Sequence, residues 1–170
     1  MIYRHYNSPF GDMIILSKNE NLVGLYFQTQ KEFKKIQDTY EAYKPYKHGV
    51  LDVFEQTKQW LDIYFLGDLP TFTPGLELDS TPFRLRVWEI LQTIKKGEVI
   101  TYKDIAKIIA KEKNIPNMSA QAVGGAVGSN PICIIIPCHR VIGSNNSLVG
   151  YAGGVDIKRK LLELEGIKID

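Results

Sequence analysis

The chain has 170 residues, of which 44% are hydrophobic and 24% charged, and its formal net charge is +2 at pH 7. This composition suits one large globular domain or two small ones and excludes a disordered or collagen-like chain. No apolar run approaches the roughly 20 residues that a membrane helix needs, and the first residues lack the charged and apolar regions of a signal peptide. We therefore expect a cytoplasmic protein.

The first 30 residues alternate between apolar and polar in the way that β-strands do. The pattern predicts strands over residues 2–6, 13–16 and 22–27, with turns at 11–12 and 19–21. Together these strands predict a small antiparallel sheet.

The next segment predicts a helix followed by a linker. Residues 31–47 are polar and only weakly periodic, whereas six later residues recur at helical spacing: Leu51, Phe54, Thr57, Trp60, Leu61 and Tyr64. That helix should end at residues 67–70 and cover one face of the sheet. Residues 70–82 contain three prolines and are typical of a linker. We therefore expect an N-terminal α/β domain over 1–75 and a C-terminal domain over 82–170.

The second half predicts two helices joined by a turn, preceded by a third. The first amphipathic helix, which Gly97 ends, is predicted by Phe83, Val87, Ile90, Leu91 and Ile94. Thr101 should cap the next helix together with Asp104, and its apolar face is Ile105, Ile108 and Ile109. A turn at 114–117 and a helix over 119–127 complete a helix-turn-helix pattern.

Charge is distributed unevenly between the two halves. Residues 1–81 carry 8 Lys/Arg against 11 Asp/Glu, and residues 82–170 carry 13 against 8, so the second half is the expected partner of a polyanion. Within it, Gly124 and Gly125 each cost about 1 kcal/mol relative to alanine in a helix interior. Small side chains there serve close helix packing or close approach to DNA. Because only Gln121 could reach base edges, we expect binding with little sequence preference.

The only cysteines are Cys133 and Cys138, too few for a disulfide framework or a four-ligand zinc site, so we expect no metal or cofactor. Residues 134–136 are three isoleucines and predict a buried strand that Pro137 ends. A cysteine beside such a run is usually structural, which is our interpretation of Cys133. Cys138 differs because His139 follows it, and a thiol needs a base or a positive neighbour to become a nucleophilic thiolate.

The segment Ile-Pro-Cys-His-Arg-Val at 136–141 is part of a longer pattern, with Asn-Pro at 130–131 and Gly-Tyr-Ala-Gly-Gly at 150–154. This pattern resembles the methylated-DNA–protein-cysteine methyltransferases, also called O6-alkylguanine-DNA alkyltransferases, over residues 84–166. The first half resembles the family mainly in length and strand pattern. The resemblance implies an α/β (α+β) fold, with a ribonuclease H-like N-terminal sheet and helix, then a mainly helical domain with a winged helix-turn-helix.

The resemblance also implies roles for individual residues. Cys138 would accept the alkyl group of O6-alkylguanine, once per molecule because a thioether is a poor leaving group. His139 would be the base, reaching Glu165 through a water, and Asn130 would organise the site by hydrogen bonds. Tyr102 would donate a proton to the ring nitrogen of the departing guanine.

The implied partner is double-stranded DNA with a flipped-out nucleotide, bound by a monomer through the minor groove without sequence preference. The residues matched to DNA contact are Tyr102, Lys103, Ala120, Gln121, Gly124 and Ser144. Those matched to the pocket and its closing segment are Val141, Tyr151, Ala152 and Lys158, and backbone amides near Tyr151 and Ala152 would hold the guanine oxygen. The resemblance leaves O4-alkylthymine open as a second substrate.

Gln121 departs from the family pattern, which commonly has an arginine there. A glutamine is shorter and uncharged, so it lacks the charge and the stacking plane of a guanidinium. We therefore expect slower or weaker nucleotide flipping than in relatives with the arginine.

Two other functions fit parts of the sequence. A non-enzymatic sensor of alkylated bases would resemble the alkyltransferase-like proteins, in which the nucleophile is replaced, and the intact Cys138 argues against it. A cysteine hydrolase would also use a cysteine, a histidine and an acid. It would leave the helix-turn-helix pattern unexplained.

Overall fold

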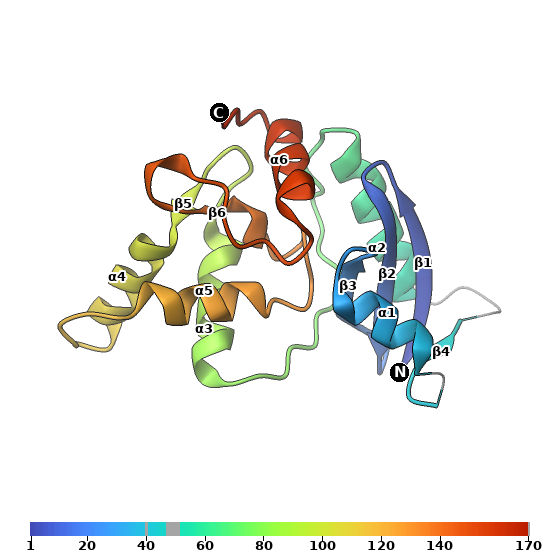
Figure 1. Ribbon diagram of the computed structural model, residues 1–170. Helices are drawn as coiled ribbons and strands as arrows, with labels where there is room; N and C mark the ends of the chain where they lie inside the picture. The colour runs from blue at the N-terminus through green and yellow to red at the C-terminus, as the bar shows by residue number, and fades with distance from the viewer. Residues whose placement is uncertain (40, 47–51, 170) are drawn as a thin grey trace. The chain divides into compact units, whose positions relative to one another are not determined.

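The computed structural model describes residues 1–39, 41–46 and 52–169, and it combines helices with two small sheets (Figure 1). This mixture confirms the predicted α/β class. The chain forms two units, one of Met1–Leu78 with Pro131–Cys133, the other of Asp79–Asn130 with the residues from Ile134 onward. Among the described residues, no helix has the length and apolar character needed to cross a membrane.

The sheet of the first unit contains the three predicted strands, β1 (Ile2–Ser8), β2 (Gly11–Lys18) and β3 (Asn21–Phe27). They pair in antiparallel fashion, and a short β4 (Lys44–Pro45) joins β1 in parallel, giving the order β3-β2-β1-β4.

The turn predicted at residues 11–12 is wrong. Both residues are already in β2, because Ser8 pairs with Gly11 and the connection is residues 9–10 alone. Gly11 has a φ of 126°, a conformation that only glycine adopts readily. Glycine is therefore needed where β2 begins, and it is not evidence of a turn at its own position.

Two helices cover opposite faces of this sheet (Figure 1). On one face, Ile14 and Leu16 of β2 pack with Phe33 and Ile36 of α1 (Lys31–Asp38). On the other lies α2 (Asp52–Phe65), which confirms the helix predicted before residues 67–70. Residues 13–16 are all buried because both faces of β2 are covered.

The sequence did not predict α1, because its polar composition conceals two buried positions. Phe33 and Ile36 are its only buried residues. Leu51, which the periodicity includes in the second helix, lies outside the described residues. Part of the segment predicted as a linker pairs with the sheet instead, since Leu76 forms a bridge with Leu22.

The second unit contains the predicted helices α3 (Pro82–Thr93), α4 (Tyr102–Glu112) and α5 (Ala120–Gly128), followed by α6 (Val155–Leu164). Strands β5 (Ile100–Thr101) and β6 (Val141–Ile142) pair in parallel. Short 3-10 turns span Cys138–Arg140 (η1) and Ser144–Asn146 (η2). Helix α5 packs against both α3 and α4.

The apolar face of α4 is narrower than predicted. Ile105 and Ile109 are fully buried, but Ile108 is 36% exposed. Ile108 fits the helical spacing from Ile105, but it points about 100° away from Ile109. It therefore lies outside the buried stripe of Ile105, Ala106, Ile109 and Ala110.

The strand predicted over residues 134–136 is also wrong, because this segment is a turn. Ile134 has a φ of 67°, in the left-handed region that a strand cannot use. The carbonyl of Ile136 accepts hydrogen bonds from the Cys138 N–H (2.8 Å) and the Asn130 side chain (2.8 Å) rather than from a neighbouring strand. The apolar run thus reflects burial, which hydrophobicity alone cannot distinguish from a core strand.

The cap of α4 provides a test of local stability. The Thr101 hydroxyl accepts from the Asp104 N–H (3.1 Å), and the Asp104 carboxylate accepts from the Thr101 backbone N–H (3.4 Å), as the predicted capping box requires. The hydroxyl also donates to that carboxylate (2.6 Å). Replacing Thr101→Ala should lower the free energy of unfolding by about 1 kcal/mol, measured by urea denaturation. Thr101→Ser keeps the hydroxyl and should retain most of the stability; equal losses in both variants would show that the cap is not responsible.

Candidate active site

Cys138 begins η1 and is 7% exposed. The Asn130 side-chain amide donates to its sulfur (3.0 Å) as well as to the Ile136 carbonyl. Burial raises the pKa of the Cys138 thiol, although the hydrogen bond from Asn130 and the charge of Lys158 oppose that rise. The resting cysteine is therefore a neutral thiol with a donor already directed at the sulfur.

His139 and Glu165 are in direct contact, with Nε2 and Oε1 2.7 Å apart and both side chains completely buried. The prediction of a water between them is wrong. Glu165 is the C-cap residue that directly follows α6, and its position there brings the carboxylate within hydrogen-bonding distance of the imidazole. The pairing itself, which was expected from the resemblance, is present.

Arg140 is a site residue that the sequence analysis did not identify. Its guanidinium binds both oxygens of Glu165, through Nε (2.9 Å) and Nη2 (3.0 Å), and donates from Nη1 to the Ile94 carbonyl (2.5 Å). The signal was available in the sequence, because an arginine in an apolar segment needs a buried carboxylate as partner.

The ionisation of the site follows from these contacts. Burial alone would raise the pKa of Glu165, but the hydrogen bonds from His139 and Arg140 hold it well below its usual range. Burial lowers the pKa of His139, and the nearby Arg140 charge adds to this, against the opposing effect of Glu165. At neutral pH the resting site therefore combines a thiol, a neutral imidazole, a carboxylate and a guanidinium.

Lys158 joins two segments beside the nucleophile. Its ammonium group, on a fully buried residue of α6, donates to the carbonyls of Val141 (2.5 Å) and Val149 (2.9 Å). Burial lowers its pKa to about 8. These contacts tie β6 and the segment before residue 150 to α6.

A hollow of about 650 Å³ contains all six residues expected to contact DNA. Its lining is Thr101, Tyr102, Lys103, Ala120, Gln121, Gly124, Gly125, Ser144, Val149 and Gly150. The Tyr102 hydroxyl lies 3.2 Å from the Val149 carbonyl, and burial raises its pKa to about 12. Tyr102 therefore remains a proton donor at neutral pH.

None of the four residues expected in the substrate pocket lines this hollow, and two of them, Val141 and Lys158, are fully buried. Tyr151 is half-buried, and Ala152 is exposed. Among the described residues, no three His, Cys, Asp or Glu side chains are grouped as a metal ion would require.

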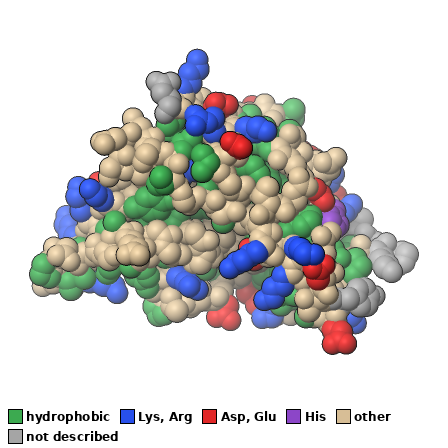
Figure 2. Space-filling view, viewed as in Figure 1, with side chains coloured by type: hydrophobic (Ala, Val, Ile, Leu, Met, Phe, Trp, Pro, Cys, Tyr) green, Lys and Arg blue, Asp and Glu red, His purple; other side chains and the backbone are tan. Residues whose placement is uncertain are grey.

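The surface of α5 consists mainly of small and apolar residues. The helix has no charged residue, and a methyl group added at Gly125 would meet no atom within 4 Å. Figure 2 shows this region as a band without Lys, Arg, Asp or Glu. Close packing therefore does not explain Gly125, and the open backbone is free to approach a large ligand.

Comparisons with known proteins cover almost the whole chain. Two family models match, the ribonuclease-like domain of 6-O-methylguanine DNA methyltransferase over residues 1–80 and its DNA binding domain over residues 82–167. A methylated-DNA–protein-cysteine methyltransferase of Haemophilus influenzae is 38% identical, with 98% of this chain and 87% of that protein covered. One from Methanosarcina acetivorans is also 38% identical, covering 98% and 99%.

Solved structures of methyltransferases are also similar to this chain over most of its length. The crystal structure of Mycobacterium tuberculosis OGT in complex with DNA matches with a TM-score of 0.80 and 38% identity, covering 97% of this chain and 92% of that one. An O6-methylguanine-DNA methyltransferase from Pyrococcus kodakaraensis matches with a TM-score of 0.61 and 29% identity, covering 98% and 99%.

The buried carboxylate can be tested by removing its charge. Glu165→Gln leaves the Arg140 guanidinium buried without a counter-ion, so the free energy of unfolding should fall by about 3 to 5 kcal/mol. Because the folded-state pKa of Glu165 is depressed, its contribution is present above the unfolded value of about 4.3 and is lost as the pH falls towards the folded value.

The matched control is Glu163→Gln, an exposed glutamate on the same helix, which should change stability by less than about 0.5 kcal/mol. Urea denaturation at pH 7 and at acidic pH measures both. Similar stabilities for the two variants would contradict the assigned ion pair.

Proposed function

The chain belongs to the 6-O-methylguanine DNA methyltransferase family, and on that premise we propose how its site repairs alkylated DNA. The repair is direct reversal, in which the methyl or alkyl group of O6-alkylguanine is transferred irreversibly to Cys138. The observation that carries this assignment is the buried Cys138 sulfur, hydrogen-bonded by Asn130 and followed by the paired His139 and Glu165. Each molecule acts once, because a thioether is a poor leaving group and the alkyl group therefore stays on Cys138.

The protonation states of the residues in the resting site support this chemistry. The Cys138 thiol transfers its proton to the neutral His139, and the sulfur forms a bond to the alkyl carbon as the bond from that carbon to guanine O6 breaks. Glu165 stabilises the imidazolium that results. The side-chain amide nitrogen of Asn130 lies 3.0 Å from the sulfur, and its hydrogen bond favours the thiolate during the attack.

The leaving guanine needs a proton or donors, since it otherwise departs as an anion. Tyr102 is the proposed proton source for its ring nitrogen, supported by a pKa raised to about 12 that keeps the hydroxyl protonated until it is needed. Backbone N–H groups near Tyr151 and Ala152 are the proposed partners of the guanine oxygen. Val141 and Lys158 complete the pocket wall.

The proposed ligand is duplex DNA whose damaged nucleotide is rotated out of the stack, at a cost of a few kcal/mol. The open face of α5 supports a close approach to the minor groove without sequence preference, by a monomer. We assign DNA binding and transfer to residues 82–170, beside an N-terminal α/β domain over 1–75, with the cytoplasm as the site of action. O4-alkylthymine is a proposed second substrate.

A transfer experiment tests the assignment of the nucleophile. Incubation with duplex DNA carrying O6-methylguanine should add a single methyl group to Cys138, located by peptide mass measurement. Cys138→Ser should abolish the adduct because a hydroxyl is a much weaker nucleophile at neutral pH. Cys133→Ser provides the matched control and should be methylated as the wild type is.

The other outcomes distinguish the competing functions. Tight binding of the damaged duplex without any adduct would identify a sensor. Repeated turnover of an ester would identify a hydrolase.

A substitution at Gln121 tests how this chain rotates the nucleotide out of the duplex. Gln121 is exposed and lines the hollow beside Tyr102, where an arginine would add a charge compatible with phosphate and a planar group that stacks. Gln121→Arg should therefore bind the duplex more tightly and transfer the methyl group faster, measured by titration and by single-turnover kinetics. No gain in either quantity would contradict the proposed limitation.

A further inference from the structure

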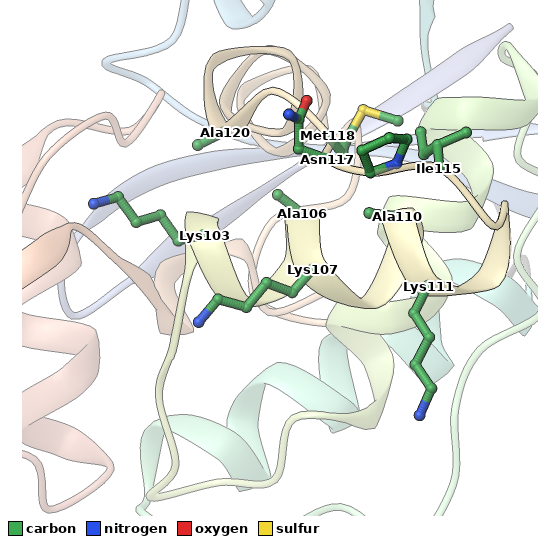
Figure 3. A pocket seen from close by; sticks show the side chains of 10 residues that line it. Lys103, Ala106, Lys107, Ala110, Lys111, Ile115, Asn117, Met118 and Ala120 are labelled. Carbon is green, nitrogen blue, oxygen red and sulfur yellow. The ribbon is translucent and has the colours of Figure 1, made fainter.

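Three lysines form a ridge along the exposed side of α4. Lys103, Lys107 and Lys111 follow one another at intervals of four residues, and all are exposed. Figure 3 shows Ala106 and Ala110 directed towards the loop of residues 115–118, whereas the Lys107 and Lys111 side chains leave the helix on the other side. The ammonium groups therefore project into solvent.

The acidic residues of α4 do not neutralise this ridge. Asp104 is bound by Thr101 and lies 3.4 Å from Lys107, and Glu112 is paired with Arg86 at 2.6 Å. Among the described residues, no ion pair involves Lys103 or Lys111. The ridge therefore keeps an excess of positive charge.

A groove connects the ridge to the hollow that contains Tyr102 and Gln121. It has a volume of about 440 Å³, lies between α4 and the loop of residues 115–118, and includes Ala106, Ala110 and Met118 in its lining (Figure 3). Lys103 and Ala120 line both this groove and the hollow that contains Tyr102 and Gln121. The two surfaces are continuous, so a long ligand at the hollow can extend along α4.

We propose that the ridge of Lys103, Lys107 and Lys111 binds the sugar-phosphate backbone of the DNA flanking the damaged nucleotide. This inference rests on the proposed function. The ridge spans about 12 Å at 1.5 Å per residue, which matches about three nucleotides of one strand at 3.4 Å each. Lysine acts as a point-charge phosphate binder and needs no exact alignment.

The composition of α5 explains why such contacts are needed. This helix has no charged residue, and binding without sequence preference draws its free energy mainly from phosphate contacts. The charge must then be supplied by an adjacent element, and α4 packs directly against α5.

The test compares two double variants with the same change in net charge. Lys107→Gln/Lys111→Gln removes two ridge charges, while Lys31→Gln/Lys35→Gln removes two exposed charges with the same spacing on α1. Binding to an undamaged duplex is titrated from roughly 50 to 200 mM salt, and log K is plotted against log salt. The ridge variant should have a slope smaller by about 1.8, or 0.9 per lost phosphate contact, and the α1 variant should match the wild type.

Further outcomes separate this inference from the proposed function. Methyl transfer from free O6-methylguanine base, which has no phosphate, should be equal in the ridge variant and the wild type. A wild-type salt slope in the ridge variant, or equal changes in both double variants, would overturn the ridge assignment while methylation of Cys138 still occurs. Failure of the wild type to methylate Cys138 would instead overturn the proposed function.

Discussion

The chemistry of this site depends on one buried carboxylate, which binds an imidazole and a guanidinium at the same time. Glu165 binds His139 through one oxygen and Arg140 through both. A carboxylate this deeply buried would normally take up a proton, because burial disfavours its charged form. The hydrogen bonds from His139 and Arg140 prevent this. Burial, with the nearby Arg140 charge, lowers the pKa of His139 and keeps the imidazole neutral.

The arrangement is built at the ends of three helices. Ile94 ends α3 and offers its carbonyl to Arg140, Asn130 follows the end of α5, and Glu165 ends α6. The last carbonyls of a helix lack partners within the helix, so the Ile94 carbonyl can accept from Arg140. The short turn η1 places Cys138, His139 and Arg140 next to these three helix ends. Residues far apart in sequence therefore form one site.

The parts of this structure that the sequence could predict are those encoded locally. The Thr101 cap, the strands β1 to β3 and the helix α5 each follow from short-range patterns, and the motif around Cys138 was sufficient to indicate the nucleophile. The turn over 134–136 was mistaken for a strand because burial and β-structure produce the same apolar run. The direct contact of Glu165 with His139, and the role of Arg140, depend on distances between separate elements that no local pattern contains.

Separating charge from the reacting surface has a physical advantage in this molecule. Helix α5 carries no charged residue, and within the site itself the charges of Arg140 and Lys158 disfavour protonation of His139. The lysines of α4 are exposed, so solvent and salt screen their charges. The uncharged, glycine-containing α5 leaves an open backbone surface for a close approach to DNA, while the proposed phosphate contacts lie on the neighbouring α4.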